Sequence, residues 1–387
     1  MTKTAIDIEE MMYTLDDIIV DYISPNAANI DRTGIFPRQN ISLLAEEGFL
    51  GLLIPKELGG CGATPSIYKE VVIKLAKACA STAMVFVQHV SATSIMLHGA
   101  HQPFIQQQLR SMASGQSLAT IALSEPGSGV YFFMPVSQMI DGEHEDFIFS
   151  AKKSMVTSAG EADIYVSNSR STSSTSALQS NYFIFRKDQE GVEIGGIWEG
   201  MGLRGNNSAP MMIQNCLIPK KAMIGKEGDG FKISRERLLP MGQIGISSIH
   251  VGITKAMYEE CVKYVKKRYY EHSDTHLSSF QSIQQMMAEM RIECDRAEGA
   301  LKDMVTKLES GDIDMVTILE IKVIACEAAG RVANLCLRVA GGHAYSSHLP
   351  LERYIRDSKA GTVLGPTPDV LKELIGKIIL DVPKTLI

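Results

Sequence analysis

The N-terminal third of the chain repeats apolar residues at the spacing of an α-helix. Between residues 7 and 22 the apolar side chains fall three or four positions apart, as at Ile8, Met11, Leu15 and Ile18. That spacing puts them on one helix face, which predicts a helix with one buried side. The same pattern predicts further helices over residues 38–49, 64–80, 81–99 and 102–113. Residues 1–117 are therefore predicted to form an N-terminal helical domain.

The pattern changes near residue 117 to short segments that are rich in β-branched and aromatic residues. Gly, Asn, Asp or Ser separates them, which is typical of strands joined by turns. The predicted strands cover residues 118–123, 147–157, 163–169, 182–187, 192–194 and 211–219. No ten-residue helical pattern intervenes, so a mostly antiparallel sheet or a small barrel is favoured over a doubly wound one. Residues 118–226 are predicted to be a middle β domain.

Helical spacing returns after residue 227 and continues to the end of the chain. Long periodic segments cover about 230–270, 280–309, 315–340 and 350–363, and a short helix starts at 368. Thr367 offers a capping hydroxyl to that last helix, with Pro368 in its first turn and Asp369 at the positive end of its dipole. Residues 227–387 are predicted to be a C-terminal helical domain, which makes the chain an α+β multi-domain protein.

The amino-acid composition limits which partners the protein binds and in which cellular compartment it is expected. Hydrophobic residues make up 45 % of the chain and charged residues 21 %, with a net charge of −6. A negative net charge gives no electrostatic reason to bind nucleic acid or an anionic membrane. No secretory signal is evident in the polar, acidic residues 1–10, and no apolar run is expected to span a bilayer. Seven scattered cysteines without a CxxC pair are read as reduced thiols, so a cytoplasmic protein is predicted.

Two local motifs suggest chemistry. His272 and His276 lie four residues apart, but nothing nearby completes a ligand set, so no metal site is predicted. The segment SEPGSG, residues 124–129, directly follows a predicted strand. Its proline and two glycines force a turn whose backbone N–H groups can face a ligand that approaches closely. Taken alone, the segment fits a ligand loop and a purely structural turn equally well.

Several segments together resemble one family, the acyl-CoA dehydrogenase flavoproteins. SEPGSG is similar to the family's TEPGAGSD loop, and KSMVTS at 153–158 lies where the family has its KxWITN strand. GFLGLLIPKELGGCG at 48–62, NCLIP at 215–219, GDGF at 228–231, GGHAY at 341–345 and LERYIRD at 351–357 resemble further family segments, in the same order and spacing. The resemblance implies an N-terminal all-α domain, a middle β-barrel or sandwich domain and a C-terminal four-helix bundle.

The same resemblance implies FAD as cofactor, bound in the crevice between the domains. Family positions that contact the flavin or its dinucleotide fall on Ser124, Gly129, Val130, Met155, Thr157, Gln281, Arg338, Gly341, Gly342 and Thr367. Ser124 and Thr157 keep the hydroxyls that the family uses. Val130, Met155 and Arg338 are departures, since the family has a serine, a tryptophan and a glutamine there.

The largest departure is at the catalytic base, which in the family is a glutamate that removes the α-proton of an acyl thioester. Counting from Arg356 and Asp357, that position falls on Gly365, and the family's alternative position falls on Gly242. Neither glycine can accept a proton. The nearest carboxylates along the chain are Asp369 and Glu236, either of which could act as a displaced base or be a helix-dipole partner or surface charge.

Three functions follow from the resemblance and its departures. The first is an FAD-dependent oxidoreductase that acts on an acyl-CoA or acyl-carrier-protein thioester, with dehydrogenation-type chemistry and a non-standard base. The second is a flavin monooxygenase or oxidase on the same fold. The third is a non-catalytic subunit that completes a heteromer with a catalytic paralogue. A homodimer or homotetramer is the expected assembly for the first two.

Overall fold

The N-terminal part of the computed structural model is a layer of short helices, as the apolar spacing predicts. The structure describes residues 8–143, 146–174, 176 and 178–382. Its first helices are α1 Ile8–Ile18, α2 Ser24–Thr33, α3 Arg38–Glu46, α4 Pro65–Ala78, α5 Ala80–Met96 and α6 Pro103–Ala113. Pro25 does not interrupt the helical backbone, which continues from α1 into α2 through a π-helical turn at Ile19–Ile23, where the Ser24 N–H bonds to the Ile19 carbonyl just before the proline.

Helix α5 is the central helix of this layer and is almost entirely buried. By length and composition alone Ala80–Gly99 is long and apolar enough to cross a membrane, whereas the sequence pattern predicted no such run. However, 89 % of that stretch is buried inside the protein, packed against α4, α8 and the first strand. Burial of this kind is what a core helix requires, so the segment is weak support for a membrane span.

Two four-stranded sheets form the middle of the chain, and all but one of their strand pairs are antiparallel. The strands are β1 Ala119–Ala122, β2 Ile140–Asp141, β3 Asp146–Val156, β4 Ile164–Arg170, β5 Ser180–Arg186, β6 Val192–Ile194, β7 Ala209–Pro219 and β8 Met223–Ile224. One sheet has the order β1-β4-β5-β8, with β1 parallel to β4, and the other has the order β2-β3-β7-β6. The rings of Phe149 and Phe183 lie 4.8 Å apart, so aromatic side chains join the two sheets. The predicted mostly antiparallel arrangement is confirmed.

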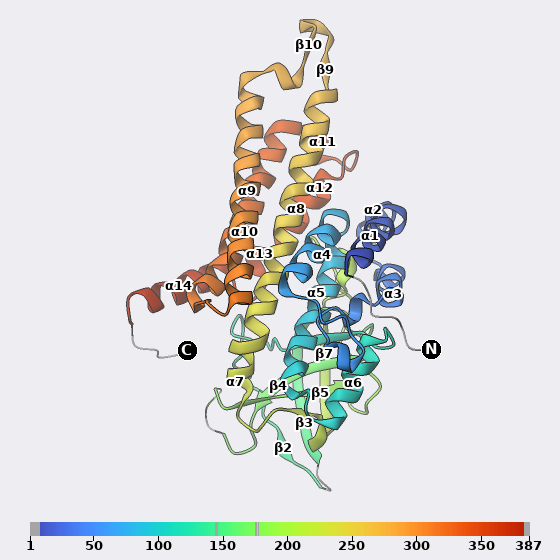
Figure 1. The fold of residues 1–387 in the computed structure, drawn as a ribbon, viewed down its shortest axis with the longest axis vertical. Helices are drawn as coiled ribbons and strands as arrows, with labels where there is room; N and C mark the ends of the chain where they lie inside the picture. Colours follow the sequence, from blue (N-terminus) through green and yellow to red (C-terminus); the bar gives the residue numbers. More distant parts are fainter. Residues whose placement is uncertain (1–7, 144–145, 175, 177, 383–387) are drawn as a thin grey trace.

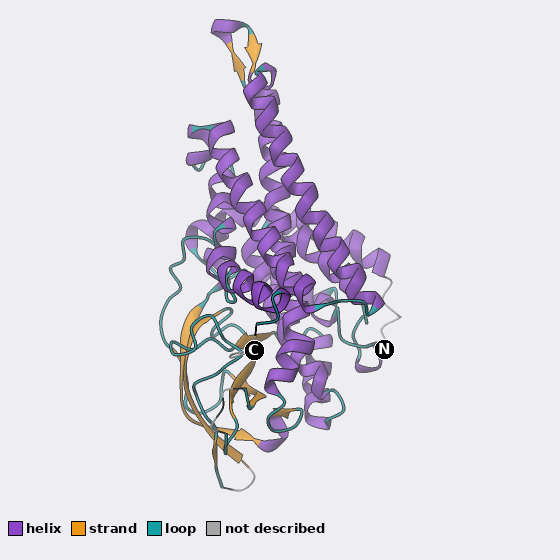
Figure 2. Cartoon of the chain, turned by 90° about the vertical axis from the view of Figure 1, so that its left-hand side faces the viewer, coloured by secondary structure: helices purple, strands orange, loops and turns teal. Residues whose placement is uncertain are grey.

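The C-terminal part is built on three long helices that run side by side along the long axis of the molecule (Figure 1). They are α8 Leu239–Lys267, α9 Gln281–Ser310 and α10 Met315–Ala340. Shorter helices complete the layer: α7 Gly230–Ile233, α11 Gly342–Tyr345, α12 Leu351–Ser358, α13 Ala360–Val363 and α14 Pro368–Ile379. A small hairpin, β9 Tyr269–Tyr270 and β10 Thr275–His276, forms the tip beyond α8 and α9, and the sheets lie at the opposite end (Figure 2).

One hydrophobic core runs through all three parts of the chain, from Leu15 in α1 to Leu351 in α12. Helix α8 contacts both α4 and α5 of the N-terminal layer, and α5 in turn contacts β1. The three parts therefore meet around α5 and the first half of α8. The domain limits at residues 117 and 226 stay a prediction.

Candidate functional site

A cavity of about 800 Å³ lies where the three parts of the chain meet. Its wall combines residues of α5, strands β1 and β3, the first two turns of α8, Lys322 of α10, and the segment that runs from Arg356 to Pro366. Apolar side chains such as Ile121, Phe132 and Leu238 make up most of this lining. An apolar cleft with a few polar groups is the usual form of a cofactor or substrate site.

Five of the twelve positions predicted from the sequence line this cavity. They are Ser124, Met155, Thr157 and the two predicted base positions, Gly242 and Gly365. Gly129 and Val130 do not line it, although the Val130 carbonyl oxygen lies only 3.2 Å from where a Cβ on Gly365 would be. Thr367 precedes α14 and is also outside the lining.

The remaining four predicted positions lie far along the helical layer. Gln281 begins α9, Arg338 is in the last turn of α10, and Gly341 and Gly342 follow it. These ends of α9 and α10 are close to the β9–β10 tip rather than to the cavity (Figure 1). Within one chain the structure does not bring them to the cavity, so their contact with the dinucleotide stays a prediction.

The end of strand β3 brings two of the predicted residues into the cavity wall. Thr157 shares a hydrogen bond of 2.9 Å with the Ser208 hydroxyl, and its carbonyl accepts a 2.8 Å bond from the Thr120 hydroxyl. Met155 has a positive φ of 51°, which non-glycine residues rarely adopt, at an irregularity in the β3–β7 pairing. Met155 is 71 % exposed and lines the cavity, so the unusual backbone conformation directs an apolar side chain away from the protein core.

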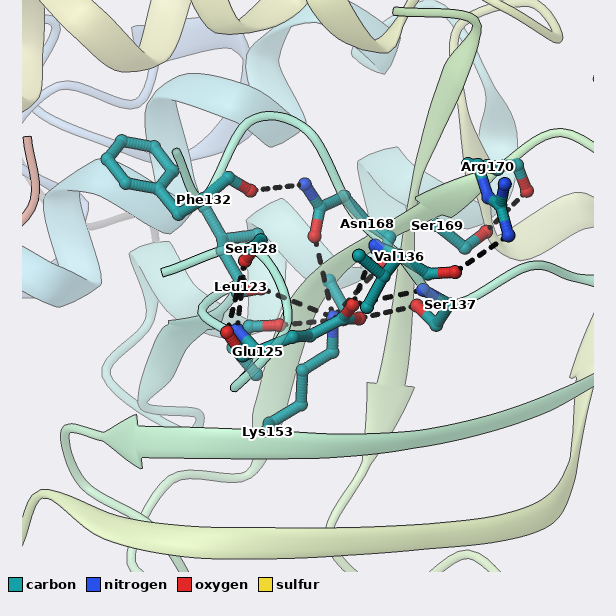
Figure 3. Close-up of polar contacts among 12 residues, drawn as sticks. Leu123, Glu125, Ser128, Phe132, Val136, Ser137, Lys153, Asn168, Ser169 and Arg170 are labelled. Atoms are coloured by element: carbon teal, nitrogen blue, oxygen red, sulfur yellow. Dashed lines mark hydrogen bonds and ion pairs between the residues drawn. The ribbon is translucent and has the colours of Figure 1, made fainter. Parts of the chain in front are cut away.

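A buried ion pair fixes the loop that contains Ser124. Glu125 accepts hydrogen bonds from the backbone N–H groups of Val136 (2.8 Å) and Ser137 (3.0 Å) and from the Lys153 ammonium (2.7 Å). Figure 3 shows these bonds converging on the Glu125 carboxylate from two segments, Val136–Ser137 and strand β3 with Lys153. The Lys153 ammonium also donates to the Asn168 carbonyl at 3.1 Å, and the Asn168 amide donates to the Phe132 carbonyl at 2.8 Å. Burial acts to raise the pKa of Glu125, but the Lys153 charge and the hydrogen bonds outweigh it and hold that pKa below its usual value.

The two predicted base positions differ in the space that surrounds them. A Cβ on Gly242 would have only ordinary contacts, at 3.9 Å to Leu238 and 4.0 Å to the Ser91 hydroxyl. On Gly365 a Cβ would lie 3.2 Å from the Val130 carbonyl oxygen, so that the loop would have to yield by a few tenths of an ångström. No Asp or Glu occurs among the described residues that line the cavity, and neither Asp369 nor Glu236 reaches it.

Lys322 is a cavity residue that the sequence analysis missed. Its side chain is buried in α10, and its ammonium donates 2.8 Å hydrogen bonds to the carbonyls of Leu364 and Pro366, on either side of Gly365. Burial without a carboxylate partner lowers the pKa of Lys322 to about 8. A lysine on the apolar stripe of α10 was the available signal, because such a side chain must find polar partners inside the protein.

Arg356 and Asp357 of α12 connect one wall of the cavity to the N-terminal layer and to the segment around Met201. Arg356 forms a two-pronged ion pair with Asp31, and it donates to the Met201 carbonyl at 2.9 Å. The Asp357 carboxylate accepts a 2.7 Å bond from the Leu203 N–H, while burial raises the pKa of Asp357 to about 6. The segment around Met201 is thereby fixed beside α12.

The arrangement of three domains around this cavity matches one protein family over nearly the whole chain. Residues 7–116 match the acyl-CoA dehydrogenase N-terminal domain, residues 120–216 its middle domain and residues 228–380 its C-terminal domain. The chain belongs to the acyl-CoA dehydrogenase family. This membership confirms the predicted fold class and the expectation of FAD as cofactor.

Individual members of this family are similar along their full length. The short-chain-specific acyl-CoA dehydrogenase of Clostridium acetobutylicum is 29 % identical over 92 % of this chain and 93 % of its own. The acryloyl-CoA reductase (NADH) of Anaerotignum propionicum is 27 % identical over 92 % of this chain and 90 % of its own. The structure of butyryl-CoA dehydrogenase from Megasphaera elsdenii superposes with a TM-score of 0.91 at 25 % identity, covering 98 % of this chain and all of that one.

Proposed function

We propose that this acyl-CoA dehydrogenase family member oxidises or reduces an acyl thioester at the Cα–Cβ bond, with FAD as cofactor and without a carboxylate base from the family positions. The observation that carries the proposal is the shared cavity of Ser124, Thr157, Gly242 and Gly365. The two hydroxyls predicted to face the flavin and both predicted base positions thus border one apolar space of about 800 Å³. The relatives that act on butyryl-CoA or acryloyl-CoA support a short acyl thioester as substrate.

The residues of the cavity suit a flavin ring beside a thioester. Thr157 and Ser124 offer hydroxyls from the β side, and the helical side offers apolar side chains with Gly242 among them. Bound there, FAD supplies hydride transfer to or from the acyl β-carbon. The chain itself orients the acyl group, excludes water through its apolar lining and has to provide a route for the α-proton.

That proton route is the non-standard part of the proposal. The lining's ionisable side chains among the described residues are Lys322, Arg356 and Lys359. Arg356 is engaged by Asp31, and the Lys322 ammonium is turned to two backbone carbonyls. None of these three side chains replaces the carboxylate as the base that removes the α-proton. We therefore expect slow dehydrogenation in which water or the substrate accepts this proton.

A flavin monooxygenase or oxidase is the second candidate. Both base positions are glycines, which leaves room in the cavity for oxygen or for a bulkier substrate. Such chemistry does not need the glutamate. Oxygen uptake with acyl thioesters separates this candidate from a dehydrogenase, which instead passes electrons to an added acceptor dye.

The first test is the visible absorption spectrum of the purified protein before and after FAD is added. We expect a flavin band that persists through gel filtration. A protein that stays colourless and fails to bind added FAD would contradict the proposal and favour a non-catalytic subunit of a heteromer.

The second test restores a carboxylate. In Gly242→Glu the new Cβ meets no atom closer than 3.9 Å, and dehydrogenation of short acyl-CoAs should rise by about 10²-fold or more, as expected of a positioned general base. Gly242→Ala is the matched control and should leave the rate unchanged. If wild-type protein is already as fast as Gly242→Glu, the account of the base is wrong.

Assembly and location complete the proposal. We expect the predicted dinucleotide residues that lie far from the cavity to contact the FAD of a neighbouring subunit; these are Gln281, Arg338, Gly341 and Gly342. Such a shared site requires at least a homodimer. The expected location of this homodimer is the cytoplasm. Light scattering of the eluting protein measures the mass directly. A monomer that retains FAD would contradict this part.

A further inference from the structure

Two glutamine side chains line the cavity from facing helices, Gln88 on α5 and Gln243 on α8. The two helices pack closely in this region. The Ser94 hydroxyl donates a 3.0 Å hydrogen bond to the carbonyl of Arg237, in the turn just before α8, and a Cβ on Gly242 of α8 would lie 4.0 Å from the Ser91 hydroxyl. Gln88 and Gln243 therefore belong to the same wall of the cavity, on the helical side.

Neither glutamine has its hydrogen-bonding capacity met by the described part of the chain. Gln243 is 3 % exposed, yet its buried amide nitrogen makes no hydrogen bond with another described residue. Gln88 has a 3.6 Å contact from its amide nitrogen to the Met84 sulfur, a weak acceptor, and its amide oxygen has no partner there. Buried polar groups are normally paired, and leaving one unpaired is destabilising. Because the terminal amide torsion is soft, either end of each amide can turn toward the cavity.

The location of the pair points to the substrate rather than to the cofactor. Ser124 and Thr157, the predicted flavin contacts, come from the opposite, β side of the cavity. Gln243 instead follows Gly242, the position from which the family can address the acyl α-carbon. A group that Gln243 binds is therefore on the acyl chain.

The charges of the lining decide which kind of group this is. No carboxylate occurs among the described lining residues, so an ammonium group on the acyl chain would have no counter-charge. Two neutral amides do not neutralise a carboxylate either. Among the cationic lining residues, Lys322 is bonded to two backbone carbonyls and Arg356 is paired with Asp31, while Lys359 comes from between α12 and α13 and not from the helices that carry the glutamines. A neutral group that both donates and accepts a hydrogen bond matches an amide oxygen on one helix and an amide N–H on the other.

We propose that Gln88 and Gln243 form a polar subsite that selects acyl thioesters carrying a hydroxyl or carboxamide on the acyl chain. This inference rests on the proposed function, because it specifies the acyl group of the thioester bound in the same cavity. A site built to hydrogen-bond a substrate group discriminates strongly against an analogue that lacks it, because its own polar groups are then left unpaired.

The test compares pairs of CoA and pantetheine thioesters that differ only in a terminal hydroxyl or methyl group, over acyl chains of increasing length. Binding to the FAD-loaded protein is measured by calorimetry and by the fluorescence of Trp198, the single tryptophan, which lines the cavity. We expect at least about tenfold tighter binding of the hydroxyacyl partner at one chain length. The preference should disappear in Gln243→Met and in Gln88→Met, while the control Gln107→Met, an exposed glutamine of α6, keeps it.

The outcomes separate this inference from the function on which it rests. Equal or tighter binding of the methyl partner at every length would overturn the subsite, and so would a preference that survives in both variants. Loss of FAD affinity in Gln243→Met would show that the amide serves the cofactor, which also overturns it. If no thioester of either kind binds, the proposed function itself fails. Should Gln243→Met not fold, Gln88→Met carries the same comparison.

Discussion

Replacing Glu125 by glutamine removes one charge from the buried pair that fixes the Ser124 loop, while it keeps the size of the side chain. The side chains of Glu125 and Lys153 are 2 % and 0 % exposed. In Glu125→Gln the Lys153 ammonium stays buried without a counter-charge. Breaking a buried pair in this way typically costs about 3–5 kcal/mol of the free energy of unfolding. We expect a loss of that size, together with weaker FAD binding because Ser124 adjoins the pair.

Urea unfolding at neutral pH measures the change, and the chain offers a matched control. Arg291 and Asp295 form an exposed pair at 2.8 Å, with side chains 60 % and 54 % exposed. Asp295→Asn should cost far less than Glu125→Gln, since solvent screens such an exposed pair. The double variant Glu125→Gln/Lys153→Met should recover part of the loss, because no charge then remains buried. If Glu125→Gln costs no more than Asp295→Asn, the buried pair does not hold the loop.

The same pair predicts a pH dependence with a definite sign. The pKa of Glu125 is held below its ordinary value of 4.5 by the Lys153 charge and the hydrogen bonds, so the folded state favours the charged carboxylate. Its contribution is fully present above that value and is lost as the pH falls toward the folded pKa. Acid unfolding of the wild type should therefore be steeper than that of Glu125→Gln.

Three further predictions concern buried groups near the cavity. His89 donates to the Leu50 carbonyl at 2.8 Å and accepts from the Ala119 N–H at 3.0 Å, and burial lowers the pKa of His89 from 6.5 to about 4. The free energy of unfolding should therefore fall by about 3 kcal/mol as the pH drops from 6.5 to 4, because the unfolded chain binds a proton at His89 that the folded chain does not. In urea titrations, His89→Gln should not show this fall. Burial lowers the pKa of Lys322 from 10.5 to about 8. The free energy of unfolding should therefore rise by about 3 kcal/mol as the pH increases from 8 to 10.5. A Lys322→Met protein that still shows this rise would contradict the lowered pKa of Lys322. Gly242→Ala should raise the thermal midpoint, because an alanine inside α8 is favoured by up to about 1 kcal/mol and meets no close atom, whereas an unchanged or lower midpoint would show hidden strain.

The pattern of the sequence predicts the fold because the helices repeat their apolar residues at helical spacing and the strands are short segments rich in β-branched and aromatic residues. The helical spacing in α1 survives in the structure, with Met11, Leu15 and Ile18 buried, and the β-rich segments form strands such as β4 and β5, which are buried along nearly their whole length. The site is predicted less completely. Ser124 and Thr157 are found from motifs, but Lys322, Gln88 and Gln243 are not, because their role arises from helices that pack together far apart in sequence. Gln281 and Gly341 show the opposite case: their motifs suggest a cofactor contact, but within one chain they begin α9 and follow α10 and are not part of the cavity lining.

The buried polar groups of this chain favour a functional cavity over a site that has lost its purpose. A buried ion pair is weak support for stability, because desolvation offsets much of its attraction. Yet three sets of buried or half-buried polar contacts each fix a different segment of the cavity wall. Glu125 with Lys153 holds the Ser124 loop, Lys322 holds the turn at Gly365, and Arg356 with Asp31 holds the segment around Met201. Folding alone would be served as well by apolar packing at these places, whereas a ligand site needs walls that keep their positions when the space between them is filled. A chain that only completed another subunit's site would not need to fix all three walls, so the structure favours ligand binding in this subunit's own cavity.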